Sequence, residues 1–232
     1  KTAIVIKKGG KKEQEIFVEP AFTDYKLMYN RWVKQREAKV KEISGGKVGY
    51  VHVEGMNSPS YREVYSKALG QYRTADALVV DTRHNGGGWL HDDLVTFLSG
   101  KAYVNYQPRG QYIGTDPYSK WVKPSCVLVC EDNYSDACGF PYAYQSLGIG
   151  KLVGTPVAGT MTAVWWENQI DPSIVFGIPQ VGCMDMRGQY AENHQLSPDI
   201  EVYNTPEKAL AGEDQQLEAA VQEMLKTIGE KK

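Results

Sequence analysis

Short apolar runs that alternate with helix-like segments set the tightest limit on how this chain can fold. Four runs are rich in Val, Leu and other apolar residues and are bounded by polar or turn residues: KVGYVHVEG, ALVVDTR, PSCVLVCEDN and KLVGTPVAG. Such runs are typical of buried strands. Segments with helical periodicity lie between the runs and after the last one, among them SYREVYSKALGQY, GGGWLHDDLVTFLSG and EDQQLEAAVQEMLKTIG. The alternation predicts an α/β fold with a mostly parallel sheet flanked by helices.

The first residues differ from this pattern. Residues 1–20 indicate a β-hairpin around a Lys-Lys-Gly-Gly-Lys-Lys turn, and residues 21–45 an amphipathic connecting helix that ends at a Gly-Gly pair. The chain opens without Met or a leader, so we interpret it as part of a larger polypeptide. The predicted core domain is residues 46–232, and the hairpin is expected to belong to a neighbouring domain.

Composition and charge exclude several kinds of partner. The chain is 42% hydrophobic, enough for a core that needs neither disulfides nor metal ions, and its net charge of −2 gives no basic footprint for nucleic acid. No apolar stretch reaches the length of a membrane span. The cysteines form no CxxC pair and are interpreted as buried thiols, so we expect no metal and no cofactor. They are Cys126, Cys130, Cys138 and Cys183.

A glycine-rich loop is expected between the second buried strand and the next helix. The stretch DTRHNGGGW covers residues 81–89. Its glycines would let the backbone approach a ligand and leave N–H groups free at a helix start, where negative charge is favoured. The spacing does not match a dinucleotide fingerprint. The alternative interpretation is an ordinary glycine-rich turn.

A serine lies between the third buried strand and a helix. Ser135 stands in CEDNYSDACGF, in a context where other folds expose a nucleophilic serine, although the G-x-S-x-G pattern is absent. If Ser135 attacks a carbonyl group, the N–H of Asp136 would face the developing oxyanion, and the glycine loop could supply a second N–H. Taken alone, a serine at a helix start is more often an N-cap.

One carboxylate stands out late in the chain. Glu192 lies in YAENHQLSPDIEV, a polar loop that it shares with Asn193 and His194. A single loop carboxylate is usually solvated surface, and this is the default interpretation for Glu192.

The order of these features along the chain is more specific than any one of them. The blocks GGKVGYVHVEGM, ALVVDTRHNGGG, NYSDACGFPYAY, LGIGKLVGTPVAGT and AENHQLSPDIEV resemble, in the same order, those of the tail-specific, C-terminal-processing serine peptidases. Within that superfamily the tricorn proteases are the nearest match. The resemblance covers about residues 44–225 and implies a ClpP/crotonase-like α/β fold, with residues 1–20 as the last hairpin of a PDZ-like domain.

The resemblance assigns roles to particular residues. It implies that Ser135 is the nucleophile and that the N–H of Asp136 forms an oxyanion hole with an N–H of Gly87 or Gly88. It also implies that Glu192 belongs to a catalytic tetrad and orients the general base through another serine. The simpler members use a lysine about 25 residues after the nucleophile. Position 160 is a threonine here, so a Ser-Lys dyad is disfavoured.

The general base is the point at which the chain departs from the family's pattern. In tricorn-like enzymes the histidine lies upstream of the PDZ-like domain, so we expect the base outside this chain. None of the four histidines stands in a block that carries the base. They are His52, His84, His91 and His194.

The resemblance also implies partners. We expect peptides or unfolded protein chains as substrates and a homo-oligomer formed through the parent protein. Many bacterial relatives are exported and tricorn itself is cytosolic, so the compartment stays open, with a lean towards export. Two other functions remain possible at this point. One is a crotonase-like acyl-group enzyme, which would share the fold and the oxyanion hole, and the other is a non-catalytic peptide-binding module.

Overall fold

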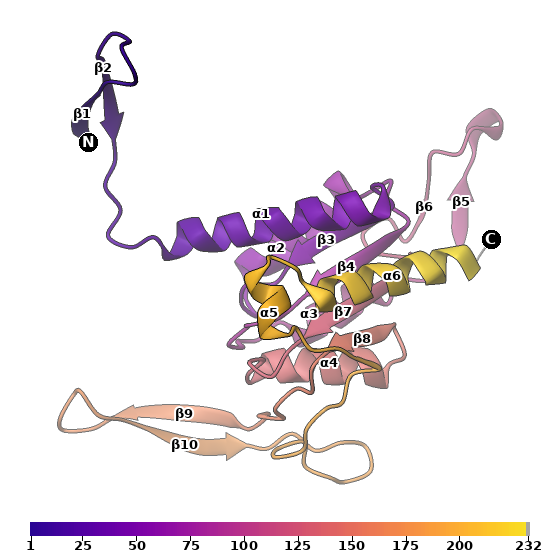
Figure 1. Cartoon of the computed structure of the whole chain (residues 1–232). Helices are drawn as coiled ribbons and strands as arrows, with labels where there is room; N and C mark the ends of the chain where they lie inside the picture. The colour runs from indigo at the N-terminus through magenta and orange to yellow at the C-terminus, as the bar shows by residue number, and fades with distance from the viewer. Residues whose placement is uncertain (231–232) are drawn as a thin grey trace. The chain divides into compact units, whose positions relative to one another are not determined.

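The computed structural model describes residues 1–230 and separates them into two compact units (Figure 1). The units are Lys1–Gln35 and Arg36–Lys232, and the last two residues of the second lie outside the described part. The hairpin and the long helix expected near the start are both present. The assignment of the hairpin to a PDZ-like domain and the domain boundaries after residues 20 and 45 stay predictions. The elements are β1 (Thr2–Ile6), β2 (Gln14–Val18) and α1 (Tyr25–Ser44).

The second unit contains the predicted parallel sheet. All four pairings between its neighbouring strands are parallel, which confirms the expected α/β architecture. The four buried-type runs of the sequence form its four longer strands, and a short fifth strand lies at one edge. The strand order is β11 (Ile200–Glu201), β8 (Lys151–Gly154), β7 (Ser125–Val129), β4 (Ala77–Asp81) and β3 (Val48–His52).

Helices cover both faces of this sheet. Side chains alternate between the faces along each strand, so neighbours such as Cys126 and Val127 point to opposite sides. Val127 belongs to the buried cluster shared with α2, α3 and α4, whereas the sulfur of Cys126 contacts the Ala220 carbonyl oxygen of α6. Burial on both faces explains why these strands are apolar throughout. The helices are α2 (Ser58–Ser66), α3 (His91–Leu98), α4 (Asp136–Ser146) and α6 (Gln215–Glu230).

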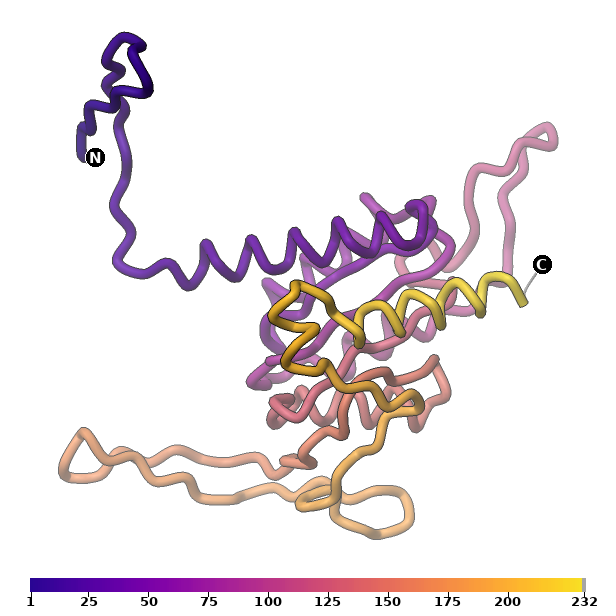
Figure 2. The backbone as a smooth tube through the Cα atoms, viewed as in Figure 1, coloured from indigo at the N-terminus to yellow at the C-terminus, as the bar shows by residue number. Residues whose placement is uncertain are grey.

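Two antiparallel hairpins stand apart from the sheet. The strands of each hairpin pair only with one another, and the residues of β9 and β10 are mostly exposed. After β8 the chain forms the β9–β10 hairpin, orange in Figure 2, and then returns to the sheet, where β11 pairs with β8. The hairpin strands are β5 (Val104–Tyr106), β6 (Gly114–Asp116), β9 (Ala163–Asn168) and β10 (Val175–Val181). The remaining elements are η1 (Lys67–Gln71), η2 (Pro108–Gly110) and α5 (Pro206–Leu210). No helix among residues 1–230 combines the length and apolar character that a membrane span requires.

A buried arginine joins the end of β4 to the start of α6. The Arg83 guanidinium donates to both carboxylate oxygens of Asp81, at 2.9 and 2.7 Å, and to both of Asp214, at 2.9 and 3.1 Å. Arg83 is 2% exposed and Asp81 is fully buried. Burial alone would raise the pKa of Asp81, but the charge and hydrogen bonds of Arg83 outweigh it and lower that pKa to about 2. Buried charges need such pairing, so the cluster fixes these two elements together.

We expect Asp214→Asn to destabilise the fold. The substitution leaves part of the Arg83 charge buried and uncompensated, which costs about 3–5 kcal/mol. Urea unfolding would measure the loss. The neighbouring Glu213→Gln is the control, because Glu213 is half exposed and lies 3.7 Å from Lys208, an ion pair worth under about 1 kcal/mol. Equal losses in the two variants would contradict this role of the cluster.

Candidate active site

Two loops that follow neighbouring strands bring the predicted residues together. The loop after β4 carries the glycine run and the loop after β7 carries Ser135. Because β4 and β7 are adjacent and parallel, both loops leave the same edge of the sheet. Gly87, at φ +97°, packs so closely that a Cβ on it would lie 2.7 Å from the Ser135 Cβ and 3.2 Å from the Asp136 nitrogen. Only glycine allows this approach.

A buried asparagine holds the two loops in contact. The Asn85 side-chain amide donates to the Val53 carbonyl at 2.8 Å, and its Oδ1 accepts the Gly87 N–H at 2.8 Å. The backbone carbonyl of Asn85 accepts the Tyr134 N–H at 3.0 Å. The Gly87 N–H is therefore already engaged. Among the described residues the Gly88 N–H donates to no protein atom, so of the two glycines only Gly88 has an N–H available to a ligand.

Asp136 has two separate roles in this geometry. Its backbone N–H donates to no acceptor within the described part of the chain. Its carboxylate accepts the N–H groups of Leu90, at 2.6 Å, and His91, at 3.1 Å, and also contacts the His91 ring. The first N–H groups of a helix have no acceptor within it. The Asp136 carboxylate accepts these N–H groups of α3 and so holds that helix against the start of α4.

Ser135 occupies a strained backbone position and does not cap α4. Its φ of 55° and ψ of −124° lie outside the regions that residues with a side chain prefer, and its side chain makes no capping hydrogen bond. Its N–H donates to the Thr160 hydroxyl at 3.3 Å. Ser135 thus stands at the N-cap position of α4, but its side chain does not act as a cap. A strained turn between a strand and a helix is also how other hydrolases present a nucleophilic serine.

Glu192 shares a hollow with Ser135. One of its carboxylate oxygens, Oε2, accepts the N–H groups of Met161, at 2.8 Å, and Thr162, at 2.7 Å. Desolvation raises the pKa of Glu192, but the hydrogen bonds from Thr162 and Met161 outweigh it, so the pKa lies below its ordinary value. The default interpretation as freely solvated surface is thus wrong. The hollow measures about 370 Å³ and is lined by Tyr134, Ser135, Thr160, Thr162, Val164, Pro179 and Glu192.

The four histidines, all within the described residues, lie outside this lining. His52 is buried, with Nε2 at 3.1 Å from the Arg83 carbonyl oxygen, and His91 contacts Asp136. His194 lies near Glu192 but directs Nδ1 to the backbone carbonyl of that residue, at 2.9 Å. Contact with the Cys130 sulfur, and then with Asp132, raises the pKa of His84 to about 9 although burial lowers it. That none of these histidines is the general base stays a prediction.

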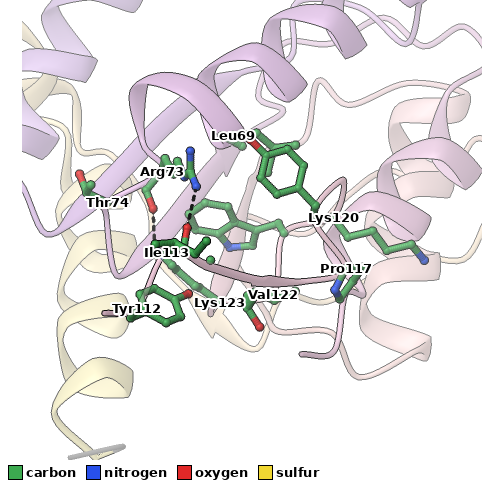
Figure 3. Close-up of a pocket in the computed structure, with 14 residues that line it drawn as sticks. Leu69, Arg73, Thr74, Tyr112, Ile113, Pro117, Lys120, Val122 and Lys123 are labelled. Atoms are coloured by element: carbon green, nitrogen blue, oxygen red, sulfur yellow. Dashed lines mark hydrogen bonds between the residues drawn. The ribbon is translucent and has the colours of Figure 1, made fainter. Parts of the chain in front are cut away.

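A larger hollow, of about 440 Å³, lies at the opposite edge of the sheet (Figure 3). Its lining includes Arg73, which precedes β4, and Lys123, which precedes β7, so it borders the amino ends of strands whose carboxyl ends carry Ser135. Arg73 donates to the Ile113 carbonyl at 3.3 Å and so contacts the β5–β6 hairpin. This hollow is separate from the candidate active site.

The fold and the site together define a class of protein. A strained serine at a strand–helix turn, next to available N–H groups at the carboxyl edge of a parallel sheet, is typical of hydrolases. Residues 47–202 match peptidase family S41. That match covers more than half of the chain, which therefore belongs to this family and is a serine peptidase domain.

Known relatives agree with this assignment. The chain is 30% identical, over 92% of its length, to tricorn protease homolog 1 of Streptomyces coelicolor, and 25% identical, over 95%, to the tricorn protease of Thermoplasma acidophilum. It spans 20% of each of those proteins. The crystal structure of the tricorn protease superposes on 97% of the chain with a TM-score of 0.87 at 23% identity, and the chain spans 22% of that structure. The fold is thus shared with tricorn protease.

We expect Gly87→Ala to damage the site and Gly86→Ala to leave it intact. A methyl group at Gly87 would meet the Ser135 Cβ and the Tyr134 carbonyl, both at 2.7 Å, whereas one at Gly86 meets nothing within 4 Å. Strain of this kind costs on the order of 1–3 kcal/mol. Thermal unfolding of the chain, and peptide hydrolysis by a protein that also contains the residues preceding it, would compare the two variants. Equal unfolding temperatures and equal hydrolysis rates of the two variants would show that Gly87 does not contact the serine loop closely.

Proposed function

We propose that this chain is the catalytic core of a tricorn-like peptidase that cleaves peptide bonds through Ser135. The observation that carries the proposal is the strained Ser135 beside the available N–H groups of Asp136 and Gly88. The Ser135 Oγ attacks the carbonyl carbon of the peptide bond, and its proton passes to a general base. The two N–H groups donate to the oxyanion that forms, and they are fixed in place before the reaction.

In this mechanism Glu192 is a positioning residue. Oε2 is fixed by the N–H groups of Met161 and Thr162. The Glu192 side chain lines the same hollow as Ser135. A carboxylate held in this way can orient a hydroxyl or imidazole group that enters the hollow. The low pKa of Glu192 keeps it ionised for that role near neutral pH.

The general base is proposed to come from a part of the peptidase outside this chain. Two observations support this: no histidine lines the hollow, and Thr160 stands where simpler relatives carry lysine. The chain spans about a fifth of the length of the tricorn relatives it matches, which leaves room for such a segment. The proposed substrates are peptides or unfolded chain ends. Assembly with further copies, the cellular compartment and the absence of a nucleic-acid partner stay predictions.

In a protein that also contains the residues preceding this chain, Ser135→Ala is expected to abolish peptidase activity and leave the fold intact. Loss of the nucleophile costs at least about 10⁴-fold in rate. A fluorophosphonate probe should label the wild type at Ser135 and fail to label the variant. Ser146→Ala, at an exposed position at the end of α4, is the control and should be labelled as the wild type is. Normal turnover in Ser135→Ala would rule out the mechanism. Failure to label the wild type, with the base present, would favour an acyl-group enzyme or a binding module.

The location of the base gives a further prediction. The isolated chain is expected to hydrolyse peptides close to background, apart from a residual acceleration of about 10³-fold over water from the oxyanion hole. A protein that also contains the residues preceding this chain is expected to be active. Full activity of the isolated chain would place the base within it, and His194→Asn would then be the first variant to measure, because His194 is the histidine nearest Glu192 in sequence.

A further inference from the structure

Three side chains of different chemistry converge beside the site without lining it. His84 follows β4, and Cys130 and Asp132 follow β7. Their ligand atoms all lie within 4.8 Å of one another. From this arrangement we propose that His84, Cys130 and Asp132 bind a thiophilic divalent cation, zinc before others.

The geometry fits one metal ion. The Nδ1 atom of His84 lies 2.9 Å from Oδ2 of Asp132 and 3.9 Å from Sγ of Cys130. In a tetrahedral zinc site, bond lengths of 2.0–2.3 Å separate neighbouring donor atoms by about 3–4 Å. The same imidazole nitrogen faces both partners. A Cys-His-Asp catalytic triad would instead use the two ring nitrogens for its two partners, so this arrangement favours a metal site over a nucleophilic cysteine.

The donor atoms select the kind of metal. A thiolate, an imidazole nitrogen and one carboxylate oxygen form a ligand set that zinc accepts, whereas Mg²⁺ and Ca²⁺ prefer oxygen ligands alone. Cys130 is buried, while the side chains of His84 and Asp132 are 60% and 65% exposed. The ion would thus enter from solvent, and water would complete its coordination on the open side.

Cys130 is held by hydrogen bonds to both its sulfur and its backbone. In the metal-free state the thiol donates to Oδ1 of Asn133 at 3.5 Å. The backbone N–H of His84 donates to the Cys130 sulfur at 3.3 Å. The backbone N–H of Cys130 donates to Oδ1 of Asn133 at 2.9 Å. The Asn133 amide in turn donates to the Thr82 hydroxyl and the Ala137 carbonyl, both at 3.0 Å. Such supporting contacts fix the orientation of a ligand and contribute to metal affinity.

Without a metal ion, Nδ1 of His84 contacts the Asp132 carboxylate directly, at 2.9 Å. A bound zinc ion would replace this contact with bonds from both groups to the metal. The ion would also join the loop after β4 to the loop after β7. These loops carry Gly88 and Ser135, but none of the three ligands lines the hollow that holds Ser135. Metal binding and the serine chemistry can therefore be tested separately.

Cobalt(II) is the probe for the test, because cobalt–thiolate ligation gives a charge-transfer absorption band. Titration should show one Co²⁺ per chain in the wild type, and the band should disappear on addition of zinc. Cys130→Ser should lose the band and bind at least about 100-fold more weakly, since loss of a supporting contact alone costs 10–100-fold. His84→Asn should also weaken binding, and this exposed position puts the fold at little risk.

Two controls separate this site from other possibilities. Cys183→Ser removes the exposed cysteine and should leave the band unchanged, and Ser135→Ala should bind cobalt as the wild type does. Zinc should also raise the unfolding temperature of the wild type but not of His84→Asn. A band that depends on Cys183, a wild type without a thiolate band, or equal binding by Cys130→Ser would each overturn the proposal.

Discussion

The pairing of Arg83 with two carboxylates is the constraint on which the rest of this structure depends. Arg83 lies between the end of β4 and the glycine run, and its partner Asp214 immediately precedes α6. With this group satisfied, α6 is fixed against one face of the sheet and the loop after β4 starts from a rigid point. An unpaired guanidinium at this depth would be very costly, so the end of β4 and the start of α6 must be positioned together.

The candidate site is rigid because each loop is held by polar groups of the other. Asn85 receives the Tyr134 N–H from the serine loop, and Asp136 receives two N–H groups from the start of α3. Within the described part of the chain, these bonds leave the N–H groups of Gly88 and Asp136 without a protein acceptor. Preorganised donors of this kind need not reorganise when charge develops on a substrate, which is the physical basis of an oxyanion hole.

Much of the second unit could be predicted from local patterns, since buried parallel strands and amphipathic helices leave clear periodicities. The sequence also predicts that Ser135 lies between a buried strand and a helix. The contacts that could not be predicted join residues far apart in sequence. Arg83 and Asp214 are separated by 131 positions, and His84 and Cys130 by 46. Local pattern indicates only a turn at Asn85, because its contacts with Val53 and Tyr134 join separate segments. It likewise indicates only surface at Glu192, because the N–H groups that Glu192 binds lie about 30 residues earlier.

The backbone at Ser135 makes stability and reactivity compete at a single position. Its φ of 55° and ψ of −124° match the first central residue of a type II′ turn, which glycine adopts without strain. A glycine there would relax the turn and would also remove the hydroxyl group that the proposed mechanism uses. Keeping a serine costs about 1–3 kcal/mol of folding free energy. The chain with serine at this position is therefore less stable than it would be with glycine. The buried contacts around the loop have to offset this loss of folding free energy.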